Sequence, residues 1–204
     1  MKVKKFRVKP RLSSVGRILK SLLSVSKLPP DIEAALPKES EEFLKNILPI
    51  ATYKTWSGSD IPADFHAQLK EKGVDGAVAL TALVVTVGAG PDETLSTLLL
   101  KGETTKAQLI TALAEDTAEV ALQFSLRLLV EEAENDECEL SSVLPVSDSK
   151  TLSEVLLAVG AEKEGILVDS AGHLSPRFTR VGLAGWIPVN KRRRTAGLKS
   201  QKSA

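Results

Sequence analysis

The sequence predicts an α+β fold in which helices pack on a central, mostly antiparallel mixed sheet. An apolar period of 3.6 residues over about 105–133 indicates one long helix. A run rich in Val and Thr at 78–87, bounded by glycines, indicates a strand buried on both faces. After Gly160 the period changes from 3.6 to 2, which predicts late strands. A chain of 204 residues with 43% apolar content can bury a sizeable core, so we expect one domain over 1–190.

The N-terminal part of this domain, about 12–50, is predicted to be helical. Apolar residues recur at helical spacing over 15–23. The Pro-Pro pair that follows is expected to end this helix and turn the chain. The pattern over 32–48 then predicts one or two short helices. Pro37 is expected to break the pattern there, with Ser40 as a candidate cap.

The remaining elements follow from local signals. Alternation at 49–56 predicts a strand, and 63–72 predicts a short helix that ends at a glycine. A helix is expected to begin near Pro91, where two acids suit a first turn, and the acidic stretch 131–139 is expected to fray the long helix into a loop.

The C-terminal elements close the predicted domain. A last helix is predicted over 151–159, ended by a glycine. Two strands at 165–170 and 177–186 are expected to form the final pair, within the central sheet and beneath the long helix.

Charge is segregated along the chain although the net charge is only +1. Residues 1–30 carry nine Lys and Arg and no acid, 31–164 carry 25 acids against 10 bases, and 165–204 carry eight bases against one acid. The basic 191–204 is interpreted as a flexible, solvated tail. Nucleic-acid association through the basic ends stays an alternative, although the tail has no aromatic residues to stack on bases.

The sequence gives no sign of a membrane or secretory segment. Its longest apolar runs are too short to cross a bilayer, and the basic N-terminus is not followed by an apolar segment of the secretory type. A cytoplasmic location is therefore expected.

No catalytic or metal signature is complete. One cysteine and two histidines exclude a zinc cluster of the usual ligands. His173 lies among hydroxyl and carboxyl residues in SAGHLSP, but residues this close in one loop rarely form a triad. The glycines of VGAGPDE resemble a phosphate-cradling turn, but the full motif spacing is missing, so a structural turn is the favoured interpretation. The acids of 131–139 lack calcium-loop spacing.

Three segments, taken in order, carry a resemblance to a known family. They are VVTVGAGPDETLSTLL at 84–99, ITALAEDTAEVALQFSLRLL at 110–129 and GAEKEGILVDSAGHLSPRFTRVGLAGW at 160–186. The sequence resembles the activation domain of vitamin B12-dependent methionine synthase and the short stand-alone proteins that share it. That family binds S-adenosylmethionine and faces a cobalamin module during reductive remethylation.

The resemblance implies candidate ligand-binding residues. Glu119 falls on the family's helix glutamate that contacts S-adenosylmethionine, although an exposed helix glutamate would look the same. The family's Arg- and Tyr-containing loop should lie within 138–149, where this chain has CELSSVLPVSDS, with Pro145 as the one relic. Arg177 or Arg180 could replace the missing carboxylate clamp, or could be surface charges.

These features lead to three hypotheses. In the first, the chain is a stand-alone relative of the activation domain that supports reactivation of, or docks onto, a corrinoid or cobalamin methyltransferase. It would have a degenerate S-adenosylmethionine site and no catalysis of its own, and cobalamin would enter only with the partner protein. In the second, it keeps S-adenosylmethionine binding and takes part in methyl transfer. The third is nucleic-acid association.

Overall fold

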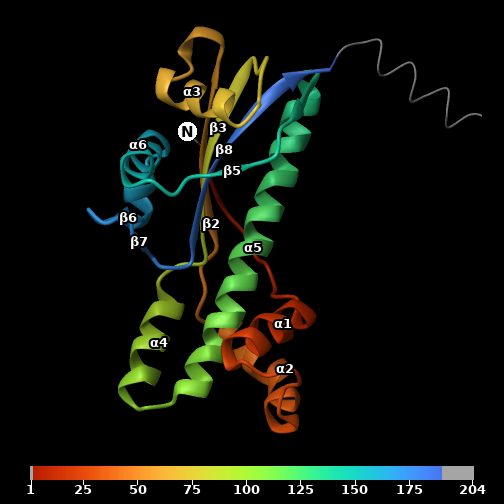
Figure 1. Cartoon of the computed structure of the whole chain (residues 1–204), viewed down its shortest axis with the longest axis vertical. Coiled ribbons are helices and arrows are strands. Elements are labelled where there is room, and N and C mark those ends of the chain that lie inside the picture. The colour runs from red at the N-terminus through yellow and green to blue at the C-terminus, as the bar shows by residue number, and fades with distance from the viewer. Residues whose placement is uncertain (1, 190–204) are drawn as a thin grey trace, which may run out of the picture.

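The computed structural model describes residues 2–189 and confirms the α+β class (Figure 1). The helices are α1 (Leu12–Leu23), α2 (Pro30–Leu44), α3 (Ala63–Glu71), α4 (Gly90–Leu100), α5 (Thr104–Asn135) and α6 (Ser149–Val159). The strands are β1 (Lys2–Lys5), β2 (Ile50–Ser57), β3 (Ala79–Thr86), β4 (Cys138–Leu140), β5 (Leu144–Pro145), β6 (Leu167–Val168), β7 (Leu174–Ser175) and β8 (Thr179–Pro188).

The main sheet has the strand order β1-β2-β3-β8-β4. Strand β5 also pairs with β8, at Gly182 and Leu183, whereas β4 pairs with β8 at 186–188. Every pairing in the main sheet is antiparallel, so the expected mixed character is absent from the described residues. Strand β3 lies between β2 and β8, with Leu83 opposite Tyr53 on one side and Gly182 on the other. All eight residues of β3 are buried, as its apolar run predicts.

The two faces of the sheet are covered by different helices. Helix α5 runs along one face (Figure 1), where Leu83 and Val85 share a cluster with Ala121 of the helix. The alternate residues Leu80 and Val84 face the other side, in a cluster that includes buried residues of α3 and α6. This alternation is the period of two expected for a strand with a covered surface on each side.

The N-terminal helices pack at one end of the long helix (Figure 1). Leu19 of α1, Leu113 of α5 and the segment before β8, through Phe178, belong to one buried cluster. The helical end and the sheet are therefore joined by a core that combines residues of α1, α5 and the segment before β8.

Helix α2 agrees with the prediction of one or two helices over 32–48, but the expected break at Pro37 and the expected cap at Ser40 are wrong. It is a single helix that contains Pro37, and Ser40 is buried inside it and caps nothing. Leu36 and Phe43, on either side of the proline, bury their side chains in the same cluster. Their packing outweighs the hydrogen bond that a proline removes from a helix.

The predicted final strand pair is also wrong in part. Only β8 joins the main sheet, whereas β6 pairs with the short β7 in a separate hairpin. The hairpin is closed by Asp169, whose Oδ1 accepts the N–H groups of Ala171 and His173, each at 2.9 Å. This local turn draws β6 away from the sheet. The acidic stretch is not a loop throughout, because α5 continues to Asn135 and β4 begins at Cys138.

The glycine turn between β3 and α4 is a packing element. Gly88 has a φ of +89°, and a Cβ at Gly90 would overlap the carbonyl oxygen of Asn46. The amide of Leu48 donates to the carbonyl of Val87 at 2.9 Å, which fixes the loop after α2 against this turn. The structural alternative for VGAGPDE therefore accounts for its glycines.

Gly90→Ala is expected to lower the free energy of unfolding by about 1–3 kcal/mol, because the backbone of Asn46 must move to admit a methyl group. The matched control is Gly16→Ala inside α1, where the new Cβ meets only Leu28 Cδ1 at 3.8 Å. That variant is expected to be more stable by about 0.5–1 kcal/mol, since alanine favours a helix. Urea unfolding of both variants measures the contrast, and equal stability would contradict the tight contact.

No helix within 2–189 is long and apolar enough to cross a membrane. The basic tail predicted for 191–204 lies outside the described residues.

Candidate functional site

Glu119 lies in a cleft of about 270 Å³ on the outer side of α5. The other lining residues come from α5 itself and from the segment that leads into α1: Val8, Arg11, Val120, Gln123, Phe124 and Arg127. Glu119 is half-buried, and its Oε1 accepts a hydrogen bond from Gln123 Nε2 at 2.9 Å. The cleft thus combines a carboxylate, two arginines and an aromatic ring.

One wall of the cleft is fixed by a buried carboxylate. Asp116 is 2% exposed and receives the Arg11 backbone N–H at 2.6 Å on Oδ2. The Arg11 guanidinium donates to Oδ1 from Nη2 at 2.9 Å and from Nε at 3.3 Å. The hydrogen bonds and charge of Asp116 raise the pKa of Arg11, so this arginine stays fully charged. Arg11 is therefore engaged, and it holds the N-terminal segment on α5.

The cleft also has a flat apolar surface. The Phe124 ring lies 4.9 Å from the Phe6 ring, with 34° between their planes, and Phe124 remains 37% exposed. Arg127 is exposed and forms no ion pair with the carboxylates of residues 2–189. The spacing of Glu119, Gln123 and Arg127 at i, i+4 and i+8 places them on one side of the helix. This spacing can be read from the sequence. The contact of the cleft with the distant Arg11 cannot.

The other predicted site residues do not line this cleft. Arg180 of β8 forms an ion pair with Glu115 of α5, and its Nη1 donates to the Thr179 carbonyl at 3.3 Å. Arg177 is exposed over the Phe178 ring, 5.6 Å from its centroid, while its backbone N–H donates to Asp92 at 2.8 Å. Arg180 is therefore engaged within the chain, and Arg177 remains at the surface.

Pro145 lies on β5, opposite Gly182, where it is exposed. The segment around it is an edge of the sheet, because Ser141 N–H donates to Gly185 O at 2.8 Å and Ser141 Oγ accepts the Gly185 N–H at 2.9 Å. Residues 138–146 of the segment 138–149, where the resemblance implies a ligand loop, are thus largely tied to β8 by main-chain contacts.

The histidine in SAGHLSP is part of the β6–β7 hairpin. His173 Nδ1 lies 3.0 Å from Asp169 Oδ2, and both side chains are exposed. The hydrogen bonds from the His173 backbone and ring lower the pKa of Asp169. No serine hydroxyl within 2–189 forms a hydrogen bond with the ring of this histidine. His173 and Asp169 therefore belong to a hairpin turn and do not form a catalytic triad with a serine. Nor do the described residues hold a cluster of three or more His, Cys, Asp or Glu that could bind a metal.

A solved structure shares this architecture. A crystal structure of the MetH reactivation domain bound to AdoHcy matches with a TM-score of 0.57 and 15% sequence identity, and covers 94% of this chain and 80% of that chain. No family model matches the chain. No curated protein matches it in sequence. The chain thus shares the fold of that structure, helices on a curled antiparallel sheet.

Proposed function

We propose that this protein is a reactivation-type module that docks onto a corrinoid methyltransferase in the cytoplasm, binds S-adenosylmethionine only weakly and catalyses no reaction alone. The supporting observation is the fold match to the MetH reactivation domain over 94% of this chain. Cobalamin belongs to the partner in this proposal. The same function was the first hypothesis from the sequence, where it rested on the resemblance of the segments 84–99, 110–129 and 160–186 to the activation-domain family.

The Glu119 cleft supports weak ligand binding. It supplies a carboxylate for the ligand's ammonium group, Arg127 for its carboxylate and Phe124 for its base. Its volume of about 270 Å³ is below the roughly 300–1,000 Å³ of ordinary ligand pockets. Gln123 already donates to Oε1 of Glu119, so the ligand's ammonium group must share that oxygen or bind Oε2 alone. Each lost charge-assisted contact costs about 1.5–3 kcal/mol, or roughly ten- to a hundredfold in affinity.

A second cleft supports docking. It measures about 400 Å³ between α3 and α6, and its walls are mainly apolar: Pro62, Ala63, Phe65, Leu157 and Ala158. Leu157 is 71% exposed, and the carboxylates of Asp64 and Glu154 stand at the rim, joined by Lys150. An apolar surface bordered by charges is typical of protein interaction sites. We assign the corrinoid methyltransferase to this surface.

Docking is tested by surface plasmon resonance with a cobalamin-loaded methionine synthase that lacks its own activation domain. Saturable binding is expected, and Leu157→Lys should weaken it at least about tenfold, as an apolar interface residue does when it is replaced by a charge. Leu100→Lys is the matched control, because Leu100 is 90% exposed but lies outside the cleft. Absence of binding, or equal loss in both variants, would contradict the proposal.

A further inference from the structure

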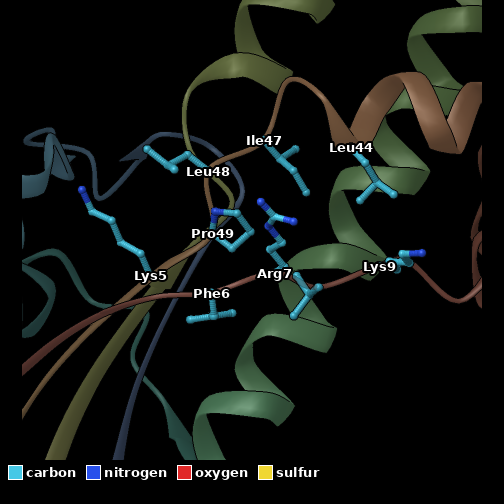
Figure 2. Close-up of a pocket in the computed structure, with 9 residues that line it drawn as sticks. Lys5, Phe6, Arg7, Lys9, Leu44, Ile47, Leu48 and Pro49 are labelled. Atoms are coloured by element: carbon cyan, nitrogen blue, oxygen red, sulfur yellow. The ribbon is translucent and has the colours of Figure 1, made fainter.

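A separate cleft of about 580 Å³ lies where the N-terminal segment passes the loop between α2 and β2. Its apolar wall is the loop Leu44, Ile47, Leu48 and Pro49, and its charged lining residues are Lys5, Arg7 and Lys9. Phe6 and Val8 also line it, but they pack in the cluster on α5. Figure 2 shows the Arg7 guanidinium among Pro49, Ile47 and Leu44, with Lys5 and Lys9 on either side of it along the segment. One exposed cation therefore lies against apolar residues of the cleft, and two more exposed cations flank it.

The cleft is positive because nothing in the described chain neutralises it. No carboxylate lines it, and none of the three cations forms an ion pair with a side chain of residues 2–189. Of the basic residues on either side, Lys2 pairs with Glu132 and Arg11 with Asp116, whereas Lys4 has no ion pair within residues 2–189. Adjacent like charges repel one another, so an anion in the cleft would relieve an existing repulsion.

The walls of the cleft are already in place. The loop wall is held by the hydrogen bond from Leu48 N–H to Val87 O and by the close packing of Gly90 on Asn46. The two walls are linked by Phe6 N–H, which donates to Pro49 O at 3.4 Å. A preformed site loses less conformational freedom when a ligand binds.

We propose that this cleft binds a small amphiphilic anion: a carboxylate or phosphate group on an apolar body. The planar guanidinium of Arg7 suits two parallel hydrogen bonds to such a head group, with Lys5 and Lys9 adding charge. The apolar wall takes the body of the ligand, which an inorganic ion would leave uncovered. This cleft shares only Val8 with the Glu119 cleft and no residue with the docking surface, so its ligand goes beyond the proposed function.

The probe is 8-anilinonaphthalene-1-sulfonate, which joins an anionic group to an aromatic body and fluoresces when it is bound. A single saturable site is expected, and Arg7→Met should weaken it about tenfold or more, the effect of losing one charge-assisted contact. Arg17→Met is the matched control, because Arg17 is exposed but does not line the cleft. The uncharged N-phenyl-1-naphthylamine should bind far more weakly.

A second variant, Leu48→Glu, places a carboxylate on the wall at a side chain that is 55% exposed, so it should weaken the probe without disturbing the core. Displacement by octanoate or by octyl phosphate, with octanol inactive, then identifies the preferred head group. Unchanged probe binding in both Arg7→Met and Leu48→Glu would overturn the proposal, as would equal binding of the charged and uncharged probes.

Discussion

Phe178→Ala is expected to lower the free energy of unfolding by about 3–5 kcal/mol, the usual cost of removing a fully buried aromatic ring. Phe178 is 0% exposed and joins the segment before β8 to the cluster of α1, α4 and α5. Its removal therefore leaves a cavity where the helical end meets the sheet. Urea unfolding followed by the fluorescence of the two tryptophans measures the loss.

Phe124→Ala is the matched control, since that ring is 37% exposed on the surface of α5. It should cost much less than Phe178→Ala. Comparable losses in the two variants would show that Phe178 does not anchor the shared core.

Asp116→Ala is expected to cost about 1.5–3 kcal/mol, the contribution of hydrogen bonds to a charged group. The buried carboxylate accepts one backbone and two side-chain hydrogen bonds from Arg11, and all three are lost in this variant. The N-terminal segment should then loosen on α5. Hydrogen exchange of the amides before α1 reports this loosening separately from global stability.

Glu131→Ala provides the comparison, because Glu131 is an exposed acid on the same helix. Its stability is expected to stay within about 0.5 kcal/mol of the parent. If Asp116→Ala lowered the free energy of unfolding no more than Glu131→Ala does, the pairing of Asp116 with Arg11 would not hold the N-terminal segment in place.

Strong local patterns predicted the long elements of this fold. The apolar period placed α5 to within two residues at either end, and the buried run at 78–87 became β3. Strands β1 and β4 were missed because each has three or four residues and exists only through pairing with a distant partner. Local composition carries no trace of such pairing.

The candidate site likewise combines residues that local sequence predicts with residues that it does not. Glu119 came from the family resemblance, and its helical neighbours Gln123 and Arg127 follow from spacing alone. The cleft is completed by Val8 and Arg11, which are over 100 residues away in sequence and could not be inferred. The stretch SPRFTRVG, which holds the two predicted clamp arginines, is largely internal: Phe178 and Val181 are buried, and Arg177 is exposed.

The most direct measurement for a docking module with a weakened ligand site is isothermal titration of the full chain with S-adenosylmethionine. A dissociation constant of about 1 mM or weaker, or no detectable heat, is expected from the small cleft and its engaged carboxylate. A micromolar dissociation constant that Glu119→Ala abolishes would contradict this claim and would establish a ligand-binding protein instead.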